Sequence, residues 1–356
     1  MLLPGKGALA FQARAPAGPA GNPLTKGPMR RRWLLFAVIL TVPYGCDNVT
    51  WGGVDVRLQD PPPKVEAAVA PGDEAAEGVA LPEVLQGPIL FAGTREGDSA
   101  TLVAVGEVRG DGLVPFPSEA EAPGFRERFT RTRLAPGTEI VLFSEGVRVG
   151  RLTVTETGTD NRFCVPRASV TGVLEVTPDA AGARRLMALL DTSAVRRPYA
   201  RYRAWEHDYD QRVASLNLAS EAIPVVGAPW PPSLLESRAD IQAFRLPETN
   251  AGTVAATFLF DDRLSVAAPA NDAYALFIMG TGAPSGYRSD FIWYRRAADD
   301  GKGAPRYFGH LDWNRDGRSE ILLDVFGAEH RWFAGIARRN GTWVRTFQDP
   351  CGEPAG

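Results

Sequence analysis

The residues best suited to bind a ligand stand in one short stretch, Asp-Trp-Asn-Arg-Asp-Gly-Arg-Ser-Glu at 312–320. Asp312, Asn314 and Asp316 place an oxygen-bearing side chain at every second position, and Gly317 follows. Alternate side chains can converge on one point when a glycine lets the loop turn sharply, and Ca2+ takes about six to eight oxygen ligands. The spacing therefore predicts a calcium loop, with a metal-free turn held by Asx-type hydrogen bonds as the alternative.

An EF-hand would need a glutamate at its twelfth position and a helix behind it. The twelfth residue is Leu323, and "EILLDVFG" at 320–327 has the pattern of a strand. The stretch instead resembles the strand-flanked calcium loops of FG-GAP and VCBS repeats, D-x-[DN]-x-D-G-x-x-[DE], known from integrin-like β-propellers and exported bacterial proteins. Because the motif occurs once, it predicts a local site and no whole propeller. The resemblance implies Ca2+ ligands at Asp312, Asn314, Asp316, Arg318 (through its carbonyl) and Glu320.

Motifs for enzymatic chemistry are missing from the sequence. The three histidines, His207, His310 and His330, fit neither H-E-x-x-H nor a zinc spacing with cysteines. "TGAPSGY" lacks the order of a nucleophile elbow, and "GKGAPR" lacks that of a phosphate loop. These absences favour a non-enzymatic module. A polysaccharide hydrolase is the alternative, because the fold can bring together two carboxylates that are distant in sequence.

The N-terminal part carries the pattern of an export signal. From Met29 the chain reads "MRRRWLLFAVILTVPYGC", in which three arginines precede a mostly apolar run that ends at Cys46. This resembles a bacterial lipoprotein signal, which implies that Cys46 becomes the lipidated first residue of the mature chain. Plain secretion and an uncleaved anchor are the alternatives. We therefore interpret 1–45 as a signal region whose true start is Met29.

The next segment, 46–88, is predicted to be a flexible linker. Its 60–88 portion is built from Pro, Ala, Gly, Val and acids, and it holds no aromatic residue. Such a composition buries too little apolar surface to offset the entropy of ordering the chain. Residues 1–45 hold six of the 39 basic residues and none of the 42 acids, so the remainder is acidic. An acidic chain without a basic stripe predicts no nucleic-acid partner.

Three cysteines are present, and two are left once Cys46 is assigned to lipid. Two thiols in an exported chain predict one disulfide, between Cys164 and Cys351, with two unpaired thiols as the alternative.

The remaining chain predicts a mainly β fold with a helical insert (α+β). Residues 89–177 form a series of apolar strand patterns separated by Gly, Asp and Pro, which predicts a β-sandwich or a small barrel. Within it, "EGVRVG" at 145–150 predicts a tight hairpin. Residues 178–250 are predicted to be helical and connecting, and 251–356 to be an aromatic-rich antiparallel β region.

Three segments carry the helical prediction, 179–193, 199–222 and 233–244; in the first, Leu186, Leu189 and Leu190 stand at helical spacing. The aromatic strands after 251 predict core packing, with a carbohydrate platform as the alternative. The tryptophans of this region are Trp293, Trp313, Trp332 and Trp343.

Together these features predict a cell-envelope lipoprotein that is held at a membrane by its lipid and acts as a binding or structural module. Its partner would be an envelope protein or a glycan. The sequence does not predict which membrane holds it.

Overall fold

The computed structural model describes residues 85–249 and 251–350, which lie within one compact unit. The predicted signal region, the lipidation site Cys46, most of the linker and Cys351 lie outside the described residues. The prediction of a mainly β fold with few helices is confirmed, since fifteen strands are present among the described residues.

The first half folds into a closed antiparallel barrel, so of the two architectures predicted for this region the barrel is present. Its hydrogen-bonded order is β1-β7-β4-β5-β6-β2, β1 pairs with β2 to close the ring, and the short β3 extends β2. These strands are β1 (Ile89–Glu96), β2 (Ser99–Arg109), β3 (Gly112–Val114), β4 (Glu139–Ser144), β5 (Val147–Asp160), β6 (Arg167–Val176) and β7 (Arg185–Leu190).

Glycines allow the barrel to close at a small radius. A Cβ at Gly150 would lie 2.0 Å from the carbonyl oxygen of Glu175, and one at Gly172 would lie 2.3 Å from that of Thr153. No other residue fits where two backbones approach this closely. Inside, the barrel is filled by a cluster that includes Phe91, Leu102 and Leu152, and α1 (Phe125–Arg133) closes one end with Phe125 and Phe129.

The second half forms two four-stranded antiparallel sheets. The outer sheet, in the order β11-β10-β9-β8, consists of β8 (Arg238–Arg245), β9 (Gly252–Phe260), β10 (Tyr274–Ala283) and β11 (Gly286–Arg296). The middle sheet runs in the order β12-β13-β14-β15 and consists of β12 (Ala304–Leu311), β13 (Glu320–Phe326), β14 (Arg331–Arg339) and β15 (Thr342–Gln348). The helical elements between strands are η1 (Pro178–Ala180), η2 (Ala194–Arg196), α2 (Tyr209–Val225), α3 (Leu234–Ser237) and α4 (Ala297–Asp300).

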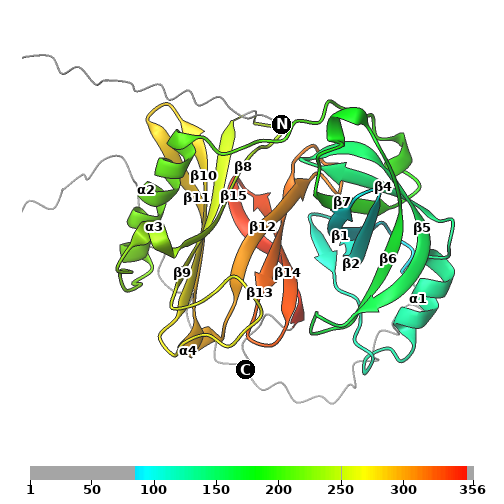
Figure 1. The fold of residues 1–356 in the computed structure, drawn as a ribbon, viewed down its shortest axis with the longest axis horizontal. Coiled ribbons are helices and arrows are strands. Elements are labelled where there is room, and N and C mark those ends of the chain that lie inside the picture. The colour runs from blue at the N-terminus through cyan, green and yellow to red at the C-terminus, as the bar shows by residue number, and fades with distance from the viewer. Residues whose placement is uncertain (1–84, 250, 351–356) are drawn as a thin grey trace, which may run out of the picture. The chain divides into compact units, whose positions relative to one another are not determined.

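These elements stack in layers, with α2 and α3 first, then the outer sheet, the middle sheet and the barrel (Figure 1). The middle sheet is therefore buried on both faces. Along β13, Ile321 and Leu323 pack toward the outer sheet, whereas Leu322 packs toward the barrel. Because side chains alternate between faces, Glu320 and Asp324 share the barrel-facing side with Leu322.

The helix predicted over 179–193 is wrong, because residues Arg185–Leu190 of this segment form strand β7 of the barrel. Leu186 and Ala188 point into the barrel, and Met187 and Leu189 point toward the middle sheet. A strand that is buried on both faces is apolar at consecutive positions, so it lacks the alternation of apolar and polar residues by which a strand is predicted from sequence.

The second predicted helix is present as α2, whose capping box joins Asp208 and Gln211. The third is much shorter than predicted, since α3 ends at Ser237 and β8 follows at once. The prediction that the four late tryptophans pack in the core is confirmed; Trp293, Trp313, Trp332 and Trp343 are all at most 7% exposed.

Candidate functional site

The acidic loop lies between β12 and β13, flanked by strands as predicted. Its side chains accept hydrogen bonds from the loop's own backbone. Asp312 accepts from the amides of Asp316 and Gly317, both at 3.1 Å, and Asp316 accepts from that of Arg318 at 2.8 Å. Asn314 also accepts from the amide of Asp316, at 3.0 Å. This pattern is that of Asx turns, the predicted alternative, and Arg315 and Gly317 supply the left-handed backbone the turn requires.

Glu320 stands apart from the other acids of the loop because it is 1% exposed. One of its oxygens accepts from the amide of Trp313 at 3.0 Å. Burial raises the pKa of Glu320 to about 9, and the charges of Asp312 and Asp316 add to this rise.

The donor chemistry of the loop fits Ca2+, since every predicted ligand offers oxygen to a hard cation. The spatial arrangement does not yet match a closed site: in the part of the chain that the structure describes, no three His, Cys, Asp or Glu side chains converge as a metal centre would require. The calcium site therefore stays a prediction.

Two residues hold the acidic loop to the rest of the body, and neither was predicted. Arg197 donates to the carbonyl oxygens of Asp312, at 2.5 Å, and of Trp313, at 3.1 Å. Glu248 accepts from the amide of Ser319 at 3.3 Å and from its hydroxyl at 3.1 Å. Because Arg197 and Glu248 are distant in sequence from the loop, no local pattern could have revealed them. Through these contacts the loop ties the barrel, the middle sheet and the β8–β9 connection together.

A second polar group lies where the tip of the β4–β5 hairpin meets β12. The tip is the predicted tight turn, and Glu145 and Gly146 have φ angles of 50° and 72°, as a type I′ turn requires. Glu145 is an unusual residue there, since a side chain disfavours positive φ. Its Oε2 is buried and finds no hydrogen-bond partner among the described residues. Burial raises the pKa of Glu145 to about 7, although Arg185 opposes the rise.

His310 and Tyr307 lie directly beneath this tip. A Cβ at Gly146 would lie 2.9 Å from His310 Nε2, so only glycine lets the hairpin approach. The Tyr307 hydroxyl and His310 Nδ1 share a hydrogen bond of 2.7 Å, and Phe244 of β8 packs against both rings. Burial lowers the pKa of His310 to about 4, so the imidazole is neutral at pH 7.

Arg185 links the three sheets at the same place. It donates to the carbonyl oxygen of Tyr307 at 2.7 Å and to Gln242 Oε1 at 2.6 Å. Gln242 in turn donates to Asp240 at 3.2 Å. Burial raises the pKa of Asp240, and Gln242 and Arg185 oppose this rise. The barrel, the outer sheet and the middle sheet are thus joined by one guanidinium.

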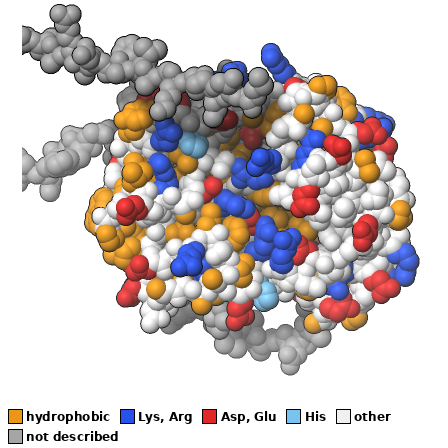
Figure 2. Space-filling model, in the orientation of Figure 1, with side chains coloured by type: hydrophobic (Ala, Val, Ile, Leu, Met, Phe, Trp, Pro, Cys, Tyr) orange, Lys and Arg blue, Asp and Glu red, His pale blue; other side chains and the backbone are white. Residues whose placement is uncertain are grey.

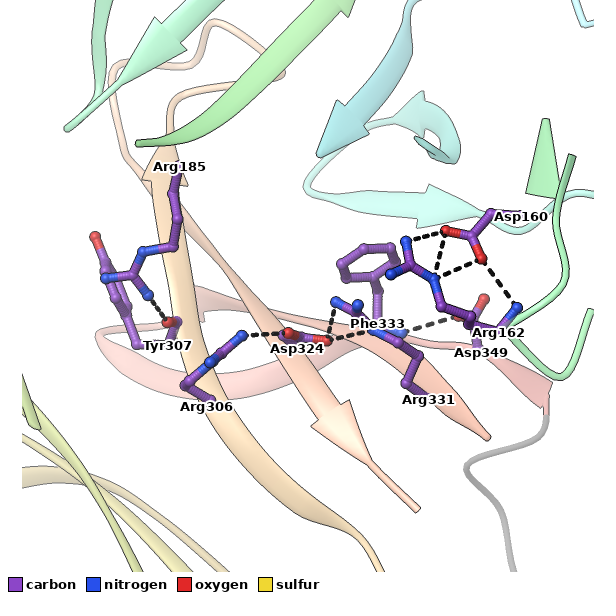
Figure 3. A network of polar contacts seen from close by, with 9 residues as sticks. All are labelled: Asp160, Arg162, Arg185, Arg306, Tyr307, Asp324, Arg331, Phe333 and Asp349. Atoms are coloured by element: carbon purple, nitrogen blue, oxygen red, sulfur yellow. Dashed lines mark hydrogen bonds and ion pairs between the residues drawn. The ribbon is translucent and has the colours of Figure 1, made fainter. Parts of the chain in front are cut away.

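Arginine and aspartate pairs occupy the rest of the interface between the barrel and the middle sheet (Figure 3). Asp324 is fully buried and accepts from Arg306 at 2.8 Å and from Arg331 at 2.7 Å. Lys and Arg side chains gather along this seam in the surface view (Figure 2).

The deepest pair joins Arg167 of β6 to Asp349, which are 3% and 1% exposed. Arg167 also donates to two carbonyl oxygens of β2, and Asp349 accepts from the amide of Phe333 at 2.9 Å. The pair therefore binds the end of the described chain to the barrel wall.

Two surface hollows of the described residues contain acidic side chains of interest for a glycosidase. One, of about 880 Å3, lies between β11 and β15 and is lined by a single acid, Asp300. A smaller one of about 240 Å3 holds Glu139 and Glu175, but both pair with Arg151, at 3.1 and 2.6 Å. Neither hollow offers the two carboxylates, one to protonate and one to attack, that such an enzyme needs.

Cys164 is engaged in a disulfide whose partner lies outside the described residues. The predicted pairing with Cys351 therefore stays a prediction. Among the described residues no helix is both long and apolar enough to span a bilayer. Comparisons of the chain with protein-family models, with curated proteins and with solved structures find no match.

Proposed function

We propose that this chain is an exported, lipid-anchored module of the cell envelope that binds a partner or supports a structure and performs no catalysis. The anchor is Cys46, and the segment that follows it is the tether between lipid and folded body. The partner is an envelope protein or a glycan.

One observation carries the non-catalytic part of this proposal. Several buried charged groups of the described body join its layers: Arg167 with Asp349, Arg306 and Arg331 with Asp324, and Arg185 with the β12 backbone. The hollow between β11 and β15, in contrast, is lined by one acid only. Charged groups that hold layers together favour a stable scaffold over a reactive cleft.

The proposal includes Ca2+ at the acidic loop, held by Asp312, Asn314, Asp316, Glu320 and the Arg318 carbonyl. An ion there would stiffen the connection between β12 and β13. Ca2+ at millimolar levels outside the cytoplasm suits a site of modest affinity.

Metabolic labelling with a radioactive fatty acid tests the anchor. Cells that express the wild-type chain should incorporate label into it, and cells that express Cys46→Ala should not. Cys164→Ala serves as the matched control and should keep the label. Equal labelling of the wild type and Cys46→Ala would refute lipidation at this position.

A further inference from the structure

The turn between α2 and α3 is unusually free of charge for a surface segment. Residues 222–235 read "AIPVVGAPWPPSLL" and contain no charged residue between Glu221 and Glu236, although 23% of the chain is charged. We call this segment the α2–α3 tip.

Large apolar side chains on the α2–α3 tip face solvent. Val225 is 77% exposed, Trp230 57% and Leu235 58%. Figure 2 shows hydrophobic side chains gathered at the edge of the body that carries α2 and α3. Exposed apolar surface of this kind, concentrated in one place and without charge, marks an interaction site.

The inner side of the α2–α3 tip is firmly packed. Ala222, Ile223 and Ala228 are buried against the outer sheet. The Tyr274 hydroxyl donates to the carbonyl oxygen of Pro229 at 3.0 Å, and the Ala228 amide donates to that of Ile223 at 3.0 Å. The exposed side chains are therefore displayed by a rigid turn, which lowers the entropy cost of binding.

We propose that the α2–α3 tip is a membrane-contacting surface that places Val225, Trp230 and Leu235 in the interfacial region of the bilayer. Tryptophan is favoured at this depth, because its ring is apolar and its N–H can reach water. The three side chains expose roughly 300–400 Å2 of apolar surface. This is less than the roughly 800 Å2 per partner that a stable protein interface buries, so the bilayer is the better-matched occupant.

The length of chain outside the described residues supports this choice. Thirty-eight residues lie between Cys46 and Leu85. If they form the flexible linker predicted from their composition, their root-mean-square span is about 35 Å. A body tethered at this distance meets the membrane at high effective concentration, so a small patch suffices. The argument from effective concentration rests on the proposed lipid anchor, whereas the exposed apolar side chains of the α2–α3 tip are observed independently of it.

Vesicles of phosphatidylcholine, with and without phosphatidylglycerol, provide the test. The mature chain from residue 46 with Cys46→Ala, which carries neither the predicted signal nor the lipid, should float with both kinds of vesicle. Adding Leu235→Asp should lower the bound fraction about tenfold or more, because a charge enters the apolar interface. Val173→Asp is the matched control: Val173 is 52% exposed on the barrel strand β6, and its replacement should change nothing.

Lipids with brominated acyl chains add a readout of position. They should quench part of the tryptophan fluorescence of the vesicle-bound chain, and Trp230→Phe should remove that part. Equal flotation of Leu235→Asp and its parent, or unchanged quenching in Trp230→Phe, would overturn the proposal.

Self-association in solution that Leu235→Asp abolishes, without vesicle binding, would instead assign the tip to a protein partner. If the labelling experiment shows no fatty acid on Cys46, only the lipid anchor is refuted. The vesicle flotation uses chain without lipid, so its result still tests the α2–α3 tip.

Discussion

Asp324, Asp349 and Glu320 are buried where the barrel meets the other layers, and Glu145 is half-buried there. These four acids differ in what faces them. Asp324 and Asp349 are bound by arginines. Glu145 and Glu320 form no ion pair among the described residues, and burial raises the pKa of each, to about 7 and about 9. The first two acids bring layers together through charge, whereas the last two bind a proton more tightly in the folded protein than a free carboxyl group does.

The difference follows from where the acids lie. Arg306 stands opposite Asp324 in the β12–β13 pair, Arg331 reaches Asp324 from the neighbouring β14, and Arg167 reaches Asp349 from the barrel strand β6. Glu145 stands at a hairpin tip above the neutral His310, and the charge of Arg185 acts on it without forming an ion pair. Glu320 lies beside two further acids. A buried acid without a cation costs stability when it ionises, so each kind should respond differently to substitution.

The largest effect is expected at the deepest pair. Asp349→Asn leaves the Arg167 guanidinium buried without a counter-charge and should lower the free energy of unfolding by about 3–5 kcal/mol. Urea unfolding measures the loss. Replacing both partners by apolar residues of similar size should recover most of the lost free energy of unfolding. A loss below about 1 kcal/mol in the single variant would show that the pair does not stabilise the junction between the barrel and the end of the described chain.

Gly146→Ala should break the contact between the hairpin tip and His310. The new Cβ would lie 2.9 Å from Nε2 at a φ of 72°, so strain and overpacking should cost about 2–4 kcal/mol. Gly97→Ala is the control for backbone strain alone, because Gly97 has a φ of 64° and open space around it. Similar melting temperatures for the two variants would contradict the close packing of the tip.

Glu145→Gln should make the protein more stable near pH 8, by about 2–3 kcal/mol. The pKa of Glu145 is raised from 4.5 to about 7 in the folded state. The folded state therefore binds the proton more tightly, and its stability falls as pH rises from 4.5 to 7 and levels off above. Thermal unfolding at pH 5 and pH 8 measures this slope, which Glu145→Gln should flatten. Glu139→Gln, on the same hairpin but exposed, should leave the slope as it is.

The smallest effect is expected at the acidic loop. Ca2+ at about ten times its dissociation constant should raise the melting temperature by about 2–5 °C. The paired substitution Asp312→Asn with Asp316→Asn should abolish the shift. Calorimetry without a binding signal, together with unchanged melting in a chelator, would reduce the loop to a turn.

Several features could be predicted from the sequence because they depend on neighbouring residues. The strand-flanked acidic loop follows from local spacing, the tight turn at Glu145 and Gly146 from turn preference, and the helix at α2 from a run of helix-compatible residues. The site as a whole could not be predicted. Arg197 reaches Asp312 across 115 positions, and Glu248 reaches Ser319 across 71.

The sequence by itself determined the mainly β class and the oxygen-rich spacing at 312–320, because both depend on composition or short-range order. The tethered N-terminal part stays a prediction from the same kind of pattern. Only the tertiary structure decided that β7 closes a barrel and that the middle sheet is buried on both faces. It also decided which buried acids meet an arginine. These outcomes depend on which distant strands pack together, and packing of that kind leaves no period in the chain.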